Sequence, residues 1–265
     1  MPTTPREQLG SRLRQLRTRA GLSGDALAKA SGLSQSKISR VETGRSLPSV
    51  EEVRAWATAT DATPEELTEL AALVEQVATT ATSWRVLQRL GLVERQREIA
   101  DLESQANRIL TFQPVVIPGL LQIADYARRV MAMGYAGEAD PRAVAARLER
   151  QSILYEESKQ FEFLITEGAL RWRPGDMNMR PQMDRLISAA NLTNVTLGIV
   201  PFDAAPTIFM NQFVLWELPD EALVTVETYS AELTVTEAHD LARYREVWQR
   251  LSAAARWAPD VLREW

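Results

Sequence analysis

Apolar residues recur at helical spacing through the first part of the chain. Leu9, Leu13 and Leu16 follow one another at intervals of four and three residues, which predicts an amphipathic helix that ends before Gly21. Five short helices are expected before residue 79, so we predict a compact helical bundle and call residues 1–78 the head. The four further helices are expected around Leu27-Ala28, at QSKISRVE, at VEEVRAWATAT and from Pro64 to about Val77.

The pattern changes after the head. The stretch ATTATSW has no apolar period, so we place a linker at residues 79–83 and call residues 84–265 the body. A long amphipathic helix is expected from Leu92 to Ile109, and a last helix from about Thr236 to Ala255. Strands are expected at FEFLIT, VTLGIVPF, TIFMNQFVLWEL and ALVTVET. The prediction is therefore a mainly α protein, with a five-helix bundle followed by a larger α+β domain that holds a small sheet.

Composition removes several classes of function. The N-terminus lacks the apolar stretch of a signal peptide, and no run approaches the roughly 18 apolar residues of a membrane helix. We therefore expect a soluble, cytoplasmic protein. The chain has no cysteine and a single histidine, His239, so disulfides, thiolate zinc sites and histidine pairs are excluded. We expect no metal, no cofactor and no enzymatic activity, although chemistry that uses carboxylates alone stays open.

Charge is distributed unevenly along the chain. Residues 1–60 hold ten basic and five acidic side chains, a net charge of +5, so the remainder carries −10 within the overall −5. Such asymmetry is expected when one domain binds a polyanion and the other repels it. The alternative is compositional bias, because arginine is frequent throughout the chain whereas lysine occurs only three times.

The helices on either side of Gly32 are joined by a short turn. Gly32 permits the turn, and Ser34 is expected to cap the next helix. The segment LRTRAGLSGDALAKASGLSQSKISRVETGRSLPS, within roughly residues 9–75, resembles the Cro/CI class of helix-turn-helix repressors, also called the Xre family. The positions that carry the resemblance are Leu27-Ala28, Gly32-Leu33-Ser34, Ile38-Ser39, Glu42, Gly44 and Pro48.

This resemblance implies a DNA-binding transcriptional regulator. It also implies a structural ion pair between Arg17 on the first helix and Glu42 at the end of the third. One position departs from the family pattern, because Gly24 stands where the family often has glutamine. The phosphate contact of that glutamine is therefore not carried over to this chain.

The helix that follows Ser34 carries the candidate DNA contacts. Gln35 can bond adenine through two hydrogen bonds, and Lys37 can reach the acceptors of guanine in the major groove. Arg45, beyond the helix, is placed for a phosphate contact. The alternative for each residue is a solvated polar face. The full set expected to contact DNA is Ser34, Gln35, Ser36, Lys37, Ser39, Arg40, Arg45 and Ser46.

The body carries a second resemblance. The segments IPGLLQIADYARRVM, RLERQSIL, FLITEGALRWRPG, MRPQMDRL, GIVPF, FVLWEL and VTVET occur in this order over about residues 84–260. They resemble the domain that follows the helix-turn-helix in a group of actinobacterial antitoxin-like regulators. That resemblance implies a short partner protein encoded nearby.

Two acidic residues of the body follow predicted strands. Glu167 and Glu227 can face one ligand or partner cleft together with Arg171 and Trp172. Paired carboxylates can perform acid–base chemistry, but a glutamate–arginine pair that joins sheet and helix is the commoner outcome.

These patterns predict a sequence-specific transcriptional regulator associated with the nucleoid. The expected partners are double-stranded operator DNA, a second copy of the chain in a homodimer, and a small protein or ligand bound by the body; no membrane is expected. The alternative is a ligand-sensing or enzymatic body that the head targets to DNA. A third possibility is an interaction adaptor whose head no longer binds DNA.

Overall fold

The computed structural model describes residues 5–83, 91–134, 138–204 and 206–264. The chain forms two compact units, one of Met1–Thr80 with Thr234–Asp240 and the other of Ala81–Leu233 with Leu241–Trp265. Within the described ranges, every helix is too short or too polar to span a lipid bilayer.

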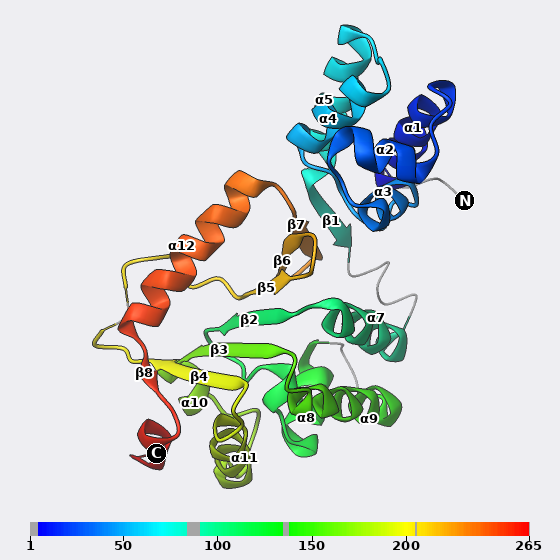
Figure 1. The fold of residues 1–265 in the computed structure, drawn as a ribbon. Helices are drawn as coiled ribbons and strands as arrows, with labels where there is room; N and C mark the ends of the chain where they lie inside the picture. The colour runs from blue at the N-terminus through cyan, green and yellow to red at the C-terminus, as the bar shows by residue number, and fades with distance from the viewer. Residues whose placement is uncertain (1–4, 84–90, 135–137, 205, 265) are drawn as a thin grey trace. The chain divides into compact units, whose positions relative to one another are not determined.

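The head contains five α-helices, as the apolar spacing predicts (Figure 1). Their core is formed by the leucines of the first helix together with Leu27, Ile38, Val41, Val53 and Trp56. The head helices are α1 (Pro5–Arg19), α2 (Gly24–Ser31), α3 (Gln35–Glu42), α4 (Val50–Ala59) and α5 (Pro64–Ala78).

Serine side chains begin three of these helices. Ser23, Ser34 and Ser49 each accept a hydrogen bond from a backbone amide in the first turn of α2, α3 and α4. At Ser49 the bond is reciprocal, because the Glu52 carboxylate accepts the Ser49 amide and completes a capping box.

The body is built on an eight-stranded mixed sheet with the order β1-β7-β6-β5-β2-β3-β4-β8. Strands β2, β3 and β4 are parallel, whereas β5 is antiparallel to β2, β6 to β5, and β8 to β4. Arg108 of β2 stands opposite Gln160 of β3 and Glu217 of β5. The strands are β1 (Thr79–Ser83), β2 (Arg108–Gln113), β3 (Gln160–Thr166), β4 (Val195–Val200), β5 (Phe213–Glu217), β6 (Ala222–Glu227), β7 (Ala231–Val235) and β8 (Arg256–Trp257).

Helices cover both faces of this sheet (Figure 1). On one face Phe161 and Phe163 of β3 share a core with Tyr126 of α8 and Leu186 of α11. On the other face Phe213 of β5 packs against the aromatic side chains of α12. The helical elements of the body are α7 (Leu92–Gln105), η1 (Gly119–Leu121), α8 (Ala124–Gly134), α9 (Pro141–Glu149), η2 (Arg150–Tyr155), α10 (Glu167–Arg171), α11 (Arg180–Ala190), α12 (Ala238–Ala254) and η3 (Asp260–Glu264).

The sheet corrects the predicted fold class. The expectation of a mainly α protein with a small sheet is wrong, because the described chain places eight strands in one sheet. The pattern revealed β3, β4, β5 and β6 but missed the other four strands. Residues 79–83, which the sequence suggested as a linker, form strand β1.

The boundary between α7 and β2 explains one of the missed strands. The apolar spacing continues from Leu92 to Ile109, but the helix ends at Gln105 and Ile109 lies in β2. Lys159 ends the helix, because its ammonium donates hydrogen bonds to the backbone carbonyls of Glu103, Ser104 and Ala106. A contact made by a residue so distant in sequence leaves no local signal.

Candidate functional site

The turn between α2 and α3 gives the helix-turn-helix geometry. Gly32 ends α2 in the left-handed conformation, with φ of 74°, which a residue with a side chain rarely adopts. Two residues later the hydroxyl of Ser34 accepts the amide of Lys37 at 3.2 Å and begins α3. The turn is therefore set by one glycine and one serine cap.

The inner face of α3 holds it to the bundle. Ile38 and Val41 are buried, and so is Lys37, which is 5% exposed. The ammonium of Lys37 lies 3.5 Å from the Glu52 carboxylate and donates to the carbonyl of Leu47 at 3.4 Å. Lys37 therefore connects α3 to the capping box of α4, rather than standing on the exposed face with Gln35.

The outer face of α3 is polar and largely uncharged. Gln35, Ser36 and Ser39 are exposed, and Ser34 is exposed beside its capping bond. Arg40 is half-buried, and its guanidinium donates to the hydroxyl of Ser36 at 3.3 Å. Short side chains on this face permit close approach to the floor of a DNA groove.

The two candidate residues after α3 differ in exposure. Arg45 is exposed, whereas Ser46 is buried. Both backbone amides donate to the carbonyl of Arg40, at 2.8 and 3.2 Å, so the chain turns tightly around the end of α3. Of these two residues, Arg45 alone presents its side chain to solvent.

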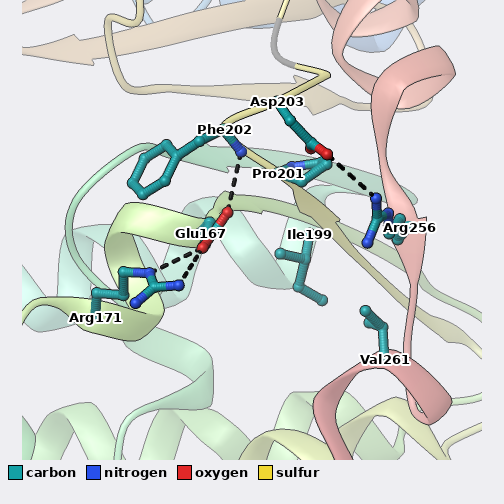
Figure 2. A pocket seen from close by; sticks show the side chains of 8 residues that line it. All are labelled: Glu167, Arg171, Ile199, Pro201, Phe202, Asp203, Arg256 and Val261. Atoms are coloured by element: carbon teal, nitrogen blue, oxygen red, sulfur yellow. Dashed lines mark hydrogen bonds and ion pairs between the residues drawn. The ribbon is translucent and has the colours of Figure 1, made fainter. Parts of the chain in front are cut away.

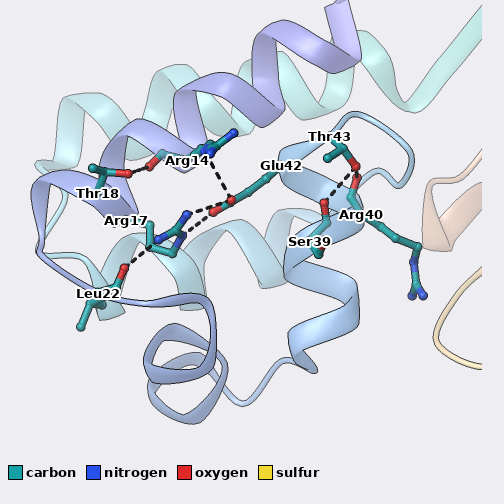
Figure 3. A network of polar contacts seen from close by, with 8 residues as sticks. All are labelled: Arg14, Arg17, Thr18, Leu22, Ser39, Arg40, Glu42 and Thr43. Carbon is teal, nitrogen blue, oxygen red and sulfur yellow. Dashed lines mark hydrogen bonds and ion pairs between the residues drawn. The ribbon is translucent and has the colours of Figure 1, made fainter.

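Arg17 and Glu42 form a two-armed ion pair (Figure 3). The Arg17 Nε and Nη2 atoms donate to the Glu42 carboxylate at 2.5 and 3.0 Å, and Nη1 donates to the carbonyl of Leu22 at 2.7 Å. The hydrogen bond to Glu42 raises the pKa of Arg17 above its ordinary value, because it favours the charged guanidinium. The pair thereby ties α1 and the turn before α2 to the end of α3.

The head as a whole carries no net charge. Over residues 1–78 ten basic side chains are balanced by ten acidic ones, because helix α5 and its approach contribute five acids. Arg12 pairs with Glu69 at 3.0 Å and Arg19 pairs with Glu66 at 2.6 Å, so acids of α5 pair with two of the bases of α1. The excess of +5 through residue 60 does not describe the whole domain.

A cavity of about 550 Å³ lies in the body at the ends of β3 and β4 (Figure 2). Glu167 and Arg171 lie on its α10 side, where Arg171 donates two hydrogen bonds to Glu167 at 2.8 and 2.6 Å. The other Glu167 oxygen accepts the Phe202 amide at 3.1 Å. That bond, together with Arg171, lowers the pKa of Glu167 below its usual range, so its carboxylate stays ionised.

The other two residues of the predicted cleft lie elsewhere. Trp172 packs edge-on against Tyr126, with ring centroids 6.2 Å apart, at the margin of the core. Glu227 ends β6, which stands three strands from β3 in the sheet order, a separation of about 14 Å. The structure therefore brings Glu167 and Arg171 together without Trp172 or Glu227.

The remaining lining residues were not identified from the sequence. Arg256 reaches the cavity because β8 pairs with β4 and sets Arg256 opposite Ile199. The segment after α12 carries no pattern that announces this contact. The lining residues not predicted are Ile199, Pro201, Phe202, Asp203, Arg256 and Val261.

Comparison with protein families identifies the body. Residues 96–260 match the family described as Domain of unknown function (DUF5753), which covers more than half of the chain. The chain belongs to the DUF5753 family. In this DUF5753 protein, residues 8–70 match a second family, described as Helix-turn-helix domain. The protein is thus a DNA-binding regulator of the helix-turn-helix type with a DUF5753 body.

Two solved structures resemble parts of this DUF5753 protein. The restriction-modification controller protein C.AhdI from Aeromonas hydrophila is 45% identical, with 23% of this chain and 91% of that chain covered and a TM-score of 0.22. The archaeal chromatin protein TrmBL2 is 14% identical, with 78% of this chain and 65% of that chain covered and a TM-score of 0.35. Both TM-scores are low, so the assignment rests on the family matches. A comparison with curated proteins found no match.

Proposed function

We propose that the head is a Cro/CI-type (Xre) domain that recognises an operator by placing α3 in the major groove. The observation that carries this proposal is the division of α3 into two faces. Lys37, Ile38 and Val41 anchor one face, and Gln35, Ser36 and Ser39 form the exposed one. A recognition helix needs this division, because its outward residues must reach base edges while the rest stays fixed.

The contacts fall into two classes. Gln35 offers an amide that matches the edge of adenine, so it reads sequence. Arg45 is placed to bond phosphate, and such contacts position the protein without reading bases. Ser36, Ser39 and Arg40 complete the surface that faces DNA.

Mapping of bound DNA tests this proposal directly. Full-length protein cross-linked to chromosomal DNA should enrich discrete sites that share a short sequence motif. Co-purified proteins should be identified in the same experiment. Uniform recovery of DNA, without a shared motif, contradicts recognition of an operator.

We also propose that the protein acts as a homodimer, with the body supplying the contact between protomers. Among the described residues, the buried core cluster of the head runs from Leu9 to Val74. One head of this size is expected to make few base contacts. Two heads held at fixed spacing add their binding energies and read half-sites one helical turn apart. In the body, β8 covers only Gly198 and Ile199 of β4, and Trp257 beside them is 44% exposed. A second copy can cover this edge.

The oligomeric state tests the homodimer. Light scattering on full-length protein should give twice the mass of one chain. A fragment ending at Ala78 should be monomeric and bind the same operator at least about tenfold more weakly, because its second contact is no longer intramolecular. A monomeric full-length protein, or a fragment of undiminished affinity, contradicts the proposal.

The body further serves, in this proposal, as the domain that binds a small partner protein or a ligand, in keeping with its resemblance to antitoxin-like regulators. No catalytic role is assigned to it. Of these two alternatives, the cavity at Glu167 favours the binding of a ligand, because its volume of about 550 Å³ lies in the range of small-molecule sites.

A further inference from the structure

The cavity of the body stands where open sheets with parallel strands bind ligands. Glu167 directly follows β3, and Pro201 and Phe202 directly follow β4, so the cavity opens at the carboxyl ends of two parallel strands. Ligands of open α/β sheets bind at this edge because the loops that follow the strands diverge there. Arg256 of β8 and Val261 of η3 close the far side (Figure 2).

The cavity presents an apolar surface between its polar walls. Ile199 and Pro201 are buried side chains that reach the lining, and Val261 stands beside Ile199 in Figure 2. Phe202 is 62% exposed, and its ring lies on the α10 side of the cavity, with Glu167 between it and Ile199 in Figure 2. The apolar floor of Ile199 and Val261 favours the hydrocarbon portion of a ligand.

Arg256 supplies the polar group with the greatest capacity to bind a ligand. Its guanidinium lies 3.7 Å from the Asp203 carboxylate, and the two side chains are 59% and 76% exposed. That distance exceeds a hydrogen bond, so the contact is Coulombic and weak in water. A guanidinium carries five N–H donors that suit a planar anion. Strand β8 is paired with β4, so the backbone of Arg256 keeps its place. Asp203 lies in the segment after β4 and holds Arg256 only loosely, so an incoming anion can replace its carboxylate.

The opposite wall carries a second guanidinium, that of Arg171, beside the Glu167 carboxylate. The Glu167 side chain is only 15% exposed, and both of its oxygens accept hydrogen bonds, from Arg171 and from the Phe202 amide. Glu167 therefore orients Arg171, whose side chain is 59% exposed on the cavity side of α10. The lining thus offers two exposed guanidinium groups across an apolar floor, and one exposed carboxylate that is loosely held.

We propose that this cavity binds a small anionic molecule with an apolar body, whose acidic group bonds Arg256 and whose apolar part lies on Ile199 and Val261. The inference deepens the ligand-binding role proposed for the body and rests on it. It does not depend on operator binding, so it is tested on protein without DNA.

A matched pair of fluorescent probes tests both halves of the proposal. The anionic probe is 8-anilinonaphthalene-1-sulfonate, and N-phenyl-1-naphthylamine is the same ring system without the sulfonate. Full-length protein should bind the anionic probe at least about tenfold more tightly than the neutral one, because only the sulfonate bonds a guanidinium.

Three variants locate the site. Arg256→Gln should weaken binding of the anionic probe about tenfold and leave the neutral probe unchanged. Asp203→Asn should strengthen binding of the anionic probe, because it removes the competing carboxylate. Arg142→Gln is the matched control, since Arg142 is 85% exposed in the body and lies outside the cavity lining.

The proposal is overturned by any of three results. The first is a full-length protein that does not bind the anionic probe. The second is equal affinity for the two probes. The third is a set of Arg256→Gln and Asp203→Asn affinities that match the wild type. Since none of these measurements involves DNA, failure here leaves operator recognition standing, and failure of operator recognition leaves this site standing.

Discussion

At the scale of single residues, the exposed face of α3 consists mainly of uncharged polar side chains. Gln35, Ser36 and Ser39 offer hydrogen bonds without net charge, whereas Arg45 offers charge outside the helix. In the proposed mode of binding, base recognition and affinity for phosphate therefore belong to different side chains. Substitution of one class should leave the other intact.

The first prediction separates these two classes. Gln35→Ala should cost about 1 to 3 kcal/mol on the preferred site and little on random DNA, because a base contact is lost. Arg45→Ala should weaken binding to both kinds of DNA and lower the salt slope by about one unit. Binding titrations at several salt concentrations measure both effects. Gln15→Ala, at an exposed position of α1, is the control. Equal losses on both DNA types for Gln35→Ala would exclude base recognition by this residue.

The second prediction concerns the pair of Arg17 with Glu42. Their side chains are 16% and 10% exposed, so removal of Glu42 leaves a guanidinium poorly solvated and without its partner. Glu42→Ala should lower the free energy of unfolding by about 3 to 5 kcal/mol. Glu69→Ala breaks the exposed pair with Arg12, whose side chains are 63% and 52% exposed, and should cost at most about 1 kcal/mol. Thermal unfolding measures the difference, and equal melting temperatures for the two variants contradict the structural role.

Sequence patterns predicted the helix and its exposed positions Gln35, Ser36 and Ser39, but not the burial of Lys37. Its charge suggested a base contact, yet position 37 lies four residues before Val41 and therefore on the inward stripe of the helix. Spacing alone could have placed it inside. Arg256 could not have been found in this way, because strand pairing brings it to Ile199 from the far end of the chain.

At the scale of elements, the orientation of α3 depends on its neighbours. Lys37 links it to the first turn of α4, and Gly10 allows α1 to approach its end. A Cβ atom built on Gly10 would lie 2.3 Å from the carbonyl oxygen of Val41, so no larger residue fits without displacement of a helix. The orientation of α3 is thus a property of the whole bundle.

The third prediction tests the link between α3 and α4. Glu52→Gln keeps the size of the side chain and an acceptor for the Ser49 amide but removes the charge that faces the Lys37 ammonium. We expect the free energy of unfolding to fall by about 1 to 3 kcal/mol. Glu51→Gln is the matched control, because Glu51 lies in the same turn of α4 and is exposed. Chemical denaturation of both variants decides the point, and a Glu52→Gln protein as stable as Glu51→Gln contradicts the link.

The helices of the head were predicted from the sequence more fully than the strands of the body. Apolar spacing located the five head helices, and serine caps marked the starts of three of them. In the body, strand β2 was missed because its residues continue the apolar spacing of α7. Strand β7 was missed because it closely follows the pattern of β6. Strand β8 has only two residues and exists through its pairing with β4. Local patterns record caps and amphipathic faces, whereas long-range pairing decides where such strands form.

At the scale of the whole molecule, the distribution of charge does not make the head basic. The head is neutral over residues 1–78, so the net charge of −5 belongs to the rest of the chain. A neutral head binds random DNA weakly, since non-specific affinity comes from the neutralisation of phosphates. In the proposed function, preference for an operator therefore comes from base contacts and from the two heads of a homodimer.

The most direct measurement is the affinity of full-length protein for two duplexes of equal length and composition at physiological salt. One carries the motif recovered from bound chromosomal DNA, and the other carries the same bases in shuffled order. We expect the motif to be bound at least about a thousandfold more tightly, which is the margin of specific over non-specific recognition. Equal affinity for the two duplexes would contradict the account, because the exposed face of α3 would then read no bases.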